Sequence, residues 1–218
     1  RMLLQHAPRN ALEVRWHGVA PSPASRVLLE SAERLGVRTM RDDRAVEARR
    51  SKGSADLLAV FVKPGGPLRP DRPQVAMLRP REPGNLGTMF RTALAFGVED
   101  VAVIGGIDPW SPHVVRASLG ACFAMRIAQP ADLAAFAASC SEPPILLHGA
   151  AETPLPRAAA TRSAATPPRI VMGPEWPGFL PVELALGRPV AIPLDPRVES
   201  LNVGVALGIA LHTLVPAP

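Results

Sequence analysis

The stretch PQVAMLRPREPGNLGTMFRTALAFGVEDVAVIGG, residues 73–106, decides the fold. It alternates apolar runs with a segment of helical spacing, in the order strand (Val75–Leu78), helix (Thr88–Phe96) and strand (Val101–Ile104). Gly97 is a natural stop for the helix. Short apolar strands that alternate with helices predict a mainly parallel sheet covered on both faces, and therefore an α/β fold.

The same alternation continues towards the end of the chain. We expect further helices at Pro112–Leu119, Pro130–Cys140 and Asn202–Leu214, and further short strands at Ile145–Leu147, Ile170–Met172 and Val190–Ile192. Residues 152–169, rich in Pro, Ala and Thr, predict a loop. The last helix is apolar nearly all round, which predicts burial. Its Gly204 and Gly208 lie four residues apart and would allow close packing of another helix.

The N-terminal part predicts a separate small α/β unit. A helix at Ala24–Leu35 is followed by short strands at Val37–Met40 and Asp56–Val62. Residues 64–73 then hold four prolines and two glycines, which neither a helix nor a central strand tolerates. We therefore expect a domain at residues 1–63, a linker at 64–73 and a second domain at 74–218.

The charge is distributed unevenly along the 218 residues. Residues 1–72 carry 14 Lys and Arg against 8 Asp and Glu, whereas residues 73–218 carry 10 against 11. The basic excess in the N-terminal third is typical of a part that binds a polyanion. The alternative is an arginine-rich surface that only meets solvent.

Other features of the composition narrow the class of protein. Cys122 and Cys140 are the only cysteines, too few for a disulfide framework or a zinc site, and they favour a reduced, cytoplasmic protein without a metal. No apolar run reaches membrane-spanning length, and the N-terminus lacks a signal-peptide pattern. A Gly-x-Gly-x-x-Gly turn, a P-loop and a nucleophile elbow are also missing, which argues against dehydrogenases, NTPases and α/β-hydrolases.

Residues 83–97 form the first of three segments that packing alone does not explain. Asn85 and Thr88 are candidate N-caps, and Gly84 and Gly87 would let the backbone approach a ligand. Arg91 lies one turn into the predicted helix among small neighbours, where a substrate would reach its guanidinium. The alternative is a capped helix with an ordinary surface arginine.

Two further segments follow predicted strands. In residues 170–178, IVMGPEWPG, a strand leads into a turn at Gly173, with Glu175 just beyond it. Such turns are where open α/β sheets bind ligands, although a surface glutamate after a turn is also common. In residues 192–206, IPLDPRVESLNVGVA, Ser200 or Asn202 would cap the last helix, which also suits a purely structural helix.

Together the three segments resemble, in order and spacing, the signature motifs of the SpoU–TrmH methyltransferases, a branch of the SPOUT superfamily. Asn85, Gly87 and Arg91 match the first motif. The second motif is matched by Gly173, Glu175 and Gly178, and the third by Ser200 to Val203. The resemblance covers residues 73–215, and three motifs in sequence form a strong signal. The stretch Asp108–Gly120 also resembles the connecting region of members that act on ribosomal RNA.

The resemblance implies a fold, a cofactor and an assembly. The fold is a parallel sheet with a C-terminal trefoil knot, preceded here by a small α/β substrate-binding domain. The cofactor is S-adenosylmethionine, held in the knot against the backbone of Leu147, His148, Gly149, Gly173, Ile192 and Leu201. The family also works as homodimers, so the expected partners are RNA and a second copy of the chain, with no membrane.

The activity implied is transfer of a methyl group to a ribose 2′-hydroxyl of structured RNA. Residues carried over as catalytic are Asn85, Arg91, Glu175, Ser200 and Asn202. The family account makes Arg91 the base, but arginine stays protonated in proteins, so a clamp on the ribose and its phosphate is a safer role. Arg116 is a further candidate for contacting RNA. Ribosomal 23S RNA is favoured over tRNA, and the alternative is a relative that binds RNA without catalysis.

Overall fold

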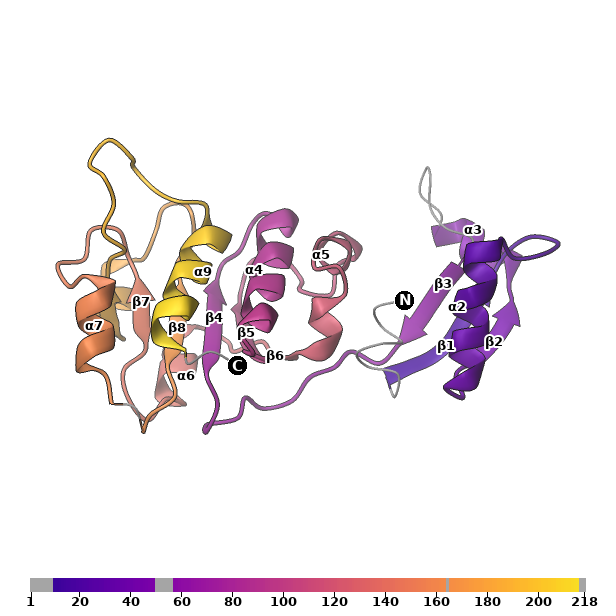
Figure 1. Cartoon of the computed structure of the whole chain (residues 1–218), viewed down its shortest axis with the longest axis horizontal. Coiled ribbons are helices and arrows are strands. Elements are labelled where there is room, and N and C mark those ends of the chain that lie inside the picture. The colour runs from indigo at the N-terminus through magenta and orange to yellow at the C-terminus, as the bar shows by residue number, and fades with distance from the viewer. Residues whose placement is uncertain (1–9, 50–56, 164, 216–218) are drawn as a thin grey trace. The chain divides into compact units, whose positions relative to one another are not determined.

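The computed structural model describes residues 10–49, 57–163 and 165–215 (Figure 1). The chain divides into two compact units, Arg1–Pro64 and Gly65–Pro218, and the division falls inside the segment rich in Pro and Gly. Within the described ranges, no helix is long and apolar enough to cross a membrane.

In the described residues of the first unit, a three-stranded sheet packs with two helices. Its elements are β1 (Ala11–Trp16), α2 (Pro23–Arg34), β2 (Arg38–Arg41), α3 (Asp43–Arg49) and β3 (Leu57–Phe61). The central β1 pairs in parallel with β2 and antiparallel with β3. Ser22 caps α2 by accepting a hydrogen bond from the Ser25 amide at 3.2 Å. Val14 of β1 is buried against Leu29 and Ala32 of that helix.

The sequence did not predict β1. The strand alternates apolar with charged residues, and Glu13 and Arg15 on its polar face pair with each other. Such a short alternating stretch becomes a strand because partners at 38–41 and 57–61 lie on either side of it. The predicted helix and the two predicted strands of this unit are present with shifted ends, and Asp56 lies outside the described residues.

The second unit is built on a six-stranded sheet in which every pairing is parallel. The strands are β4 (Gln74–Leu78), β5 (Asp100–Ile104), β6 (Arg126–Ala128), β7 (Ile145–Leu147), β8 (Arg169–Met172) and β9 (Arg188–Val190). Their spatial order is β6-β5-β4-β8-β7-β9. The chain therefore runs from β4 to one edge, crosses over to β7, and returns to insert β8 beside β4.

Helices cover both faces of this sheet, as the alternation predicted. They are α4 (Pro83–Ala95), α5 (Pro112–Ala117), the 3₁₀ turn η2 (Ala121–Ala124), α6 (Leu133–Ala138), α7 (Leu155–Thr161), α8 (Pro181–Leu184) and α9 (Val203–Leu214). Figure 1 shows α4 and α9 side by side in front of the sheet, and the two helices are in contact. On the other face, Leu133 and Phe136 of α6 pack on Ala76, Ala102 and Val171.

Some predicted boundaries were wrong. Residues 152–169 are not a loop throughout, because α7 occupies Leu155–Thr161; buried Leu155 anchors it, and its amide donates to the Ala191 carbonyl at 2.8 Å. β9 ends at Val190 instead of Ile192, because its neighbour β7 ends at Leu147; beyond that point Ala191 forms only an isolated parallel bridge with Pro154. The short β6 was not predicted.

The last helix is less buried than its composition predicted. Val205 and Ile209 of α9 are 54% and 37% exposed, so one side of the helix is open in the single chain. The other side packs closely on α4. A Cβ added to Gly204 would lie 2.8 Å from the Thr88 methyl group, so this position requires glycine for the helices to approach.

Segment 64–73 is held to the sheet at its second half. Arg69 donates from its backbone amide and from Nε to the carboxylate of Asp100, at 2.8 Å in each case. Asp100 is fully buried, and Arg69 also pairs with Glu99. A further bond runs from the guanidinium of Arg169 to the Pro70 carbonyl at 2.7 Å. These contacts fix the entry of the chain into β4.

Candidate functional site

A pocket lies where β4 and β8 end side by side. The two strands are neighbours in space although β5, β6 and β7 separate them in sequence, so this is a point where the strand order reverses. Ligands bind at such points beyond the carboxyl ends of the strands. The pocket lining includes Leu78, Arg81, Asn85, Gly173 and Glu175.

Three predicted catalytic residues from different segments form one hydrogen-bonded group in this region. The Asn85 amide of α4 donates to the carboxylate of Glu175, in the turn after β8. The Asn202 amide donates to the Asn85 side-chain oxygen at 3.2 Å. Glu175 and Asn202 are 90 and 117 residues away from Asn85 in sequence, so folding alone brings the three motifs together.

Local structure explains how two of these side chains are aimed. Of the two predicted cap candidates, Asn202 and not Ser200 is the N-cap of α9, and its side-chain oxygen accepts from the Gly204 amide at 2.9 Å. Asn85 is not an N-cap, and neither is Thr88, because α4 begins at Pro83 and its N-cap is Glu82. Proline is favoured at a first helical position because it lacks the amide hydrogen that would be unpaired there. Asn85 therefore lies in the first turn, with its side chain free to bond outward.

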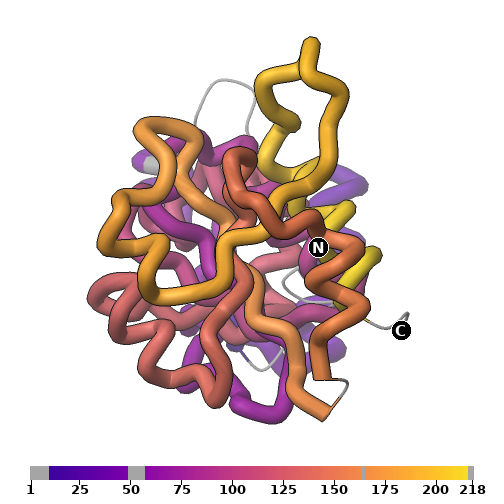
Figure 2. Tube along the Cα trace, turned by 90° about the vertical axis from the view of Figure 1, so that its left-hand side faces the viewer, coloured from indigo at the N-terminus to yellow at the C-terminus, as the bar shows by residue number. Residues whose placement is uncertain are grey.

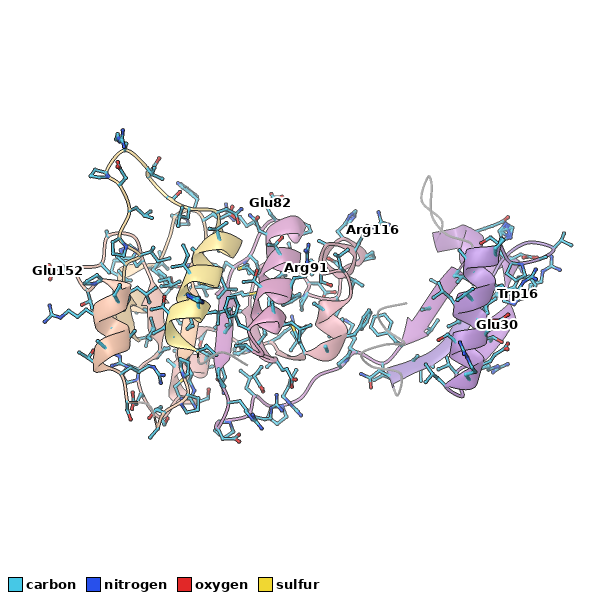
Figure 3. The ribbon with its side chains drawn as sticks, in the orientation of Figure 1. Trp16, Glu30, Glu82, Arg91, Arg116 and Glu152 are labelled. Atoms are coloured by element: carbon cyan, nitrogen blue, oxygen red, sulfur yellow. The ribbon has the colours of Figure 1, made fainter. Side chains whose placement is uncertain are left out.

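The remaining candidates for catalysis and RNA binding are exposed. Figure 3 shows Arg91 about midway along α4 and Arg116 on the neighbouring α5. Among the described residues, neither guanidinium has a hydrogen-bond or ion-pair partner, and the Ser200 hydroxyl has none either. Asn85 and Asn202 bond to each other and Asn85 to Glu175, and none of them bonds Arg91 in the single chain. Arg91 is instead free to meet an incoming anion.

Most residues expected to contact the cofactor gather at the same edge of the sheet. Leu147 ends β7, where it pairs with Met172 of β8 and Val190 of β9. His148 and Gly149 follow it, and nothing lies within 4 Å of where a Cβ of Gly149 would be. Gly173 follows Met172 and lines the pocket.

The two other expected cofactor contacts lie in the segment between β9 and α9. Ile192 stands two residues beyond the end of β9, and Leu201 directly precedes the helix cap; both are half-buried. Figure 2 shows this segment projecting away from the sheet. It starts at the same edge of the sheet as the turns after β7 and β8.

Gly87 has a different role from the one expected. A Cβ added there would lie 2.5 Å from the Ala117 methyl group and 2.6 Å from backbone atoms of α5. Gly87 is also buried. Its small size therefore lets α5 pack against α4, instead of exposing backbone to a ligand.

The sequence did not point to an ion pair that holds the second motif in place. Arg79, directly after β4, donates to both carboxylate oxygens of Glu183 in α8. Glu183 also accepts from the Leu180 amide at 2.8 Å and is 8% exposed. No local signal marks a pair that is 104 residues apart. Arg79 also donates to the Gly178 carbonyl at 3.4 Å, which ties the pair to the last residue of the second motif.

This ion pair makes stability depend on pH. Hydrogen bonding from Arg79 is the main cause that holds the pKa of Glu183 below its usual value. A lowered carboxyl pKa contributes stability above the unfolded value of about 4.3, and the contribution is lost as pH falls through the folded pKa. We therefore expect Glu183→Gln to lower the melting temperature at neutral pH. The deficit should shrink as pH falls below about 5.

Thermal melts of both proteins between about pH 3 and 7 measure this effect. Glu152→Gln, which changes an exposed glutamate, is the matched control. A deficit that stays constant across the whole range would contradict the assignment.

Comparison with known proteins shows the family of this chain. The family model described as "SpoU rRNA Methylase family" matches residues 73–212, which hold all three motifs and the whole parallel sheet. The chain belongs to the SpoU rRNA methylase family. An uncharacterized tRNA/rRNA methyltransferase of Synechocystis is 35% identical to it over 144 residues, 62% of the chain and 49% of that protein. The human mitochondrial rRNA methyltransferase 3 is 48% identical over 48 residues, 22% of the chain and 11% of that protein.

Solved structures of SpoU-type proteins share the fold. An rRNA methyltransferase of Sinorhizobium meliloti, crystallised with AdoMet bound, superposes with a TM-score of 0.72 and 27% identity, over 94% of this chain and 79% of that one. The SpoU methyltransferase AviRb of Streptomyces viridochromogenes gives a TM-score of 0.73 at 21% identity, over 98% and 85%. This SpoU family chain spans about half the length of its cyanobacterial relative.

Proposed function

We propose that this chain transfers a methyl group from S-adenosylmethionine to a ribose 2′-hydroxyl of structured RNA. The observation that carries the proposal is the hydrogen-bonded group of Asn85, Glu175 and Asn202, with unpaired Arg91 on the same helix. Three motifs of a methyltransferase family meet at the position where an open parallel sheet binds ligands. A relative that had lost catalysis would have no need to keep this arrangement intact.

The residues at the sheet edge fit S-adenosylmethionine. The pocket lining combines apolar side chains with a few polar groups, which is typical of sites for small organic ligands. The open backbone at Gly149 and the turn at Gly173 offer peptide groups to an adenosine, and Ile192 and Leu201 offer apolar cover. When bound, the cofactor supplies a methyl group that its sulfonium makes electrophilic. The trefoil knot around this site stays a prediction.

Arg91 is assigned the task of holding RNA. Its guanidinium is exposed and unpaired among the described residues, so it has free donors for a phosphate or for the oxygen that loses its proton. Stabilising a developing alkoxide is a role for a fixed cation, and arginine keeps its charge at neutral pH. Asn85, Ser200 and Asn202 then orient the nucleotide, and Glu175 fixes Asn85. Arg116 contributes a further phosphate contact.

Ribosomal RNA is the favoured substrate. The matching family model describes rRNA methylases, and the human relative is named as one. The basic excess in residues 1–72 supplies a surface for gripping a polyanion. We therefore place 23S rRNA ahead of tRNA.

The test is transfer of labelled methyl from S-adenosylmethionine to unmodified tRNA, 16S rRNA and 23S rRNA. We expect label in 23S rRNA at one dinucleotide that resists alkaline hydrolysis, because a 2′-O-methyl group removes the nucleophile that cleaves the chain. Label on a base, which leaves alkaline cleavage intact, would overturn the ribose assignment. Cofactor binding without label in any RNA would favour an RNA-binding relative without catalysis.

The chain is also proposed to act as a homodimer. Val205 and Ile209 leave an apolar strip open on α9, next to the helix that carries Arg91. Covering such a strip is favourable because it removes apolar surface from water. We expect a dimer mass in sedimentation, and Val205→Glu with Ile209→Glu should give monomers of unchanged secondary structure. A monomeric wild-type protein at assay concentration would contradict the dimer.

A further inference from the structure

A tryptophan within the second motif is not among the residues assigned to catalysis or to cofactor binding. Trp176 follows Glu175 in the turn after β8 and is 71% exposed. Among the described residues it is the one aromatic side chain that is largely open to solvent. Large aromatic side chains are usually buried, because burial removes much apolar area from water. The exposure of Trp176 therefore needs a reason.

A cation is already placed against this ring. The guanidinium carbon of Arg81 lies 6.0 Å from the ring centroid, which is within the range of a cation–π contact. Arg81 comes from the loop between β4 and α4, whereas Trp176 comes from the turn after β8. Arg81 is exposed too, and its side chain has no ion-pair partner among the described residues. The contact therefore orients the indole without covering it.

The ring is tied to the catalytic group through its neighbour in sequence. Glu175 accepts the hydrogen bond from Asn85, and Arg81, Asn85 and Glu175 all line the pocket. Arg81 thus lines the pocket together with Asn85 and also contacts the Trp176 ring. The chain offers few other aromatic rings on which a base could stack, since it has no Tyr and only 4% aromatic residues.

We propose that Trp176, oriented by Arg81, is a stacking platform for an unpaired RNA base next to the ribose that is methylated. This inference rests on the proposed function and adds the way in which the nucleotide is presented. Unstacked bases in RNA loops are held by aromatic rings and arginine planes, and such stacking tolerates any base because every base has a flat apolar face. Holding the neighbouring base fixes the position of the ribose relative to Asn85.

Binding is tested on the full chain without any need for catalysis. Fluorescence is recorded for the wild-type protein and for Trp176→Phe, and the difference isolates the emission of Trp176. We expect a short oligoadenylate to quench this difference signal, and heparin, a polyanion without bases, to leave it unchanged. Arg81→Ala should weaken the quenching. No quenching by oligoadenylate, or equal quenching by heparin, overturns the platform.

Methyl transfer gives a second, separate measurement. Trp176→Ala should raise the KM for RNA by roughly five- to 150-fold, the range for loss of one stacked base, with the KM for S-adenosylmethionine unchanged. Trp176→Phe should recover most of the loss. Val182→Ala, which truncates another exposed apolar side chain nearby in sequence, is the control and should have no effect.

The two measurements separate the inference from the function on which it rests. Wild-type protein that methylates RNA, together with an unchanged KM in Trp176→Ala, would overturn the platform and leave the function standing. Wild-type protein that transfers no methyl group, together with base-specific quenching, would overturn the function and retain a base-binding site at Trp176.

Discussion

Arg91→Ala is expected to lower methyl transfer to RNA by about a hundredfold to a thousandfold, the range for losing one group that stabilises charge in a transition state. The guanidinium is exposed on α4 and has no partner within the described chain, so its removal breaks no contact of the fold. The melting temperature and the affinity for S-adenosylmethionine should therefore stay unchanged. The measurement is single-turnover transfer of labelled methyl, with calorimetry for the cofactor.

Two further variants make this experiment specific. Arg157→Ala removes an exposed arginine from α7 and should keep full activity. Arg91→Lys keeps the positive charge, and the clamp role predicts partial activity with an unchanged pH profile. A shift of the pH optimum in Arg91→Lys would favour the base role instead. Full activity in Arg91→Ala would remove Arg91 from the site.

The second large effect is expected from the buried carboxylate that anchors the start of β4. Arg69→Met should lower the free energy of unfolding by about 2–4 kcal/mol, because it leaves the buried Asp100 without its main partner. We expect a value in the lower half of the range, since Arg69 is 37% exposed and the Arg126 guanidinium lies 3.9 Å from the same carboxylate. The backbone amide of Arg69 still donates to Asp100 in the variant.

Denaturant unfolding monitored by circular dichroism measures this loss. Arg72→Met is the matched control, because Arg72 stands three residues away and pairs with Asp71 at the surface at 3.9 Å. Surface pairs contribute about 0–1 kcal/mol. Equal destabilisation by the two variants would show that the buried pair contributes no more to stability than the surface pair.

The sequence alone was sufficient for the fold class of the second unit. Apolar runs such as Val75–Leu78 and Val101–Ile104 are short and continuous, and the spacing between them suits a helix, so a parallel sheet covered on both faces follows from hydrophobic periodicity. The three motifs, with Asn85, Glu175 and Asn202 at fixed positions, also gave the family. Apolar runs and motif spacing are local signals, and they can be recognised without knowledge of the fold.

Local sequence signals failed to predict segments whose structure depends on pairing or packing with distant parts of the chain. The strand β1 and the helix α7 were missed, and the start of α4 was placed five residues late, because pairing and packing there outweigh the intrinsic preferences of short segments. The same limit holds for Gly87, whose neighbour Ala117 belongs to another helix. A glycine in sequence does not say whether it makes room for a ligand or for a helix.

The sequence by itself therefore determined the fold class, the family and the residue types of the site. Each of these follows from the spacing of apolar residues or of motif residues along the chain. Only the tertiary structure decided which of those residues meet. It joined Asn85 to Glu175 and Asn202, left Arg91 free, paired Arg79 with Glu183 and set Trp176 against Arg81. Such contacts depend on the spatial order of the strands in the sheet, and hydrophobic periodicity does not encode that order.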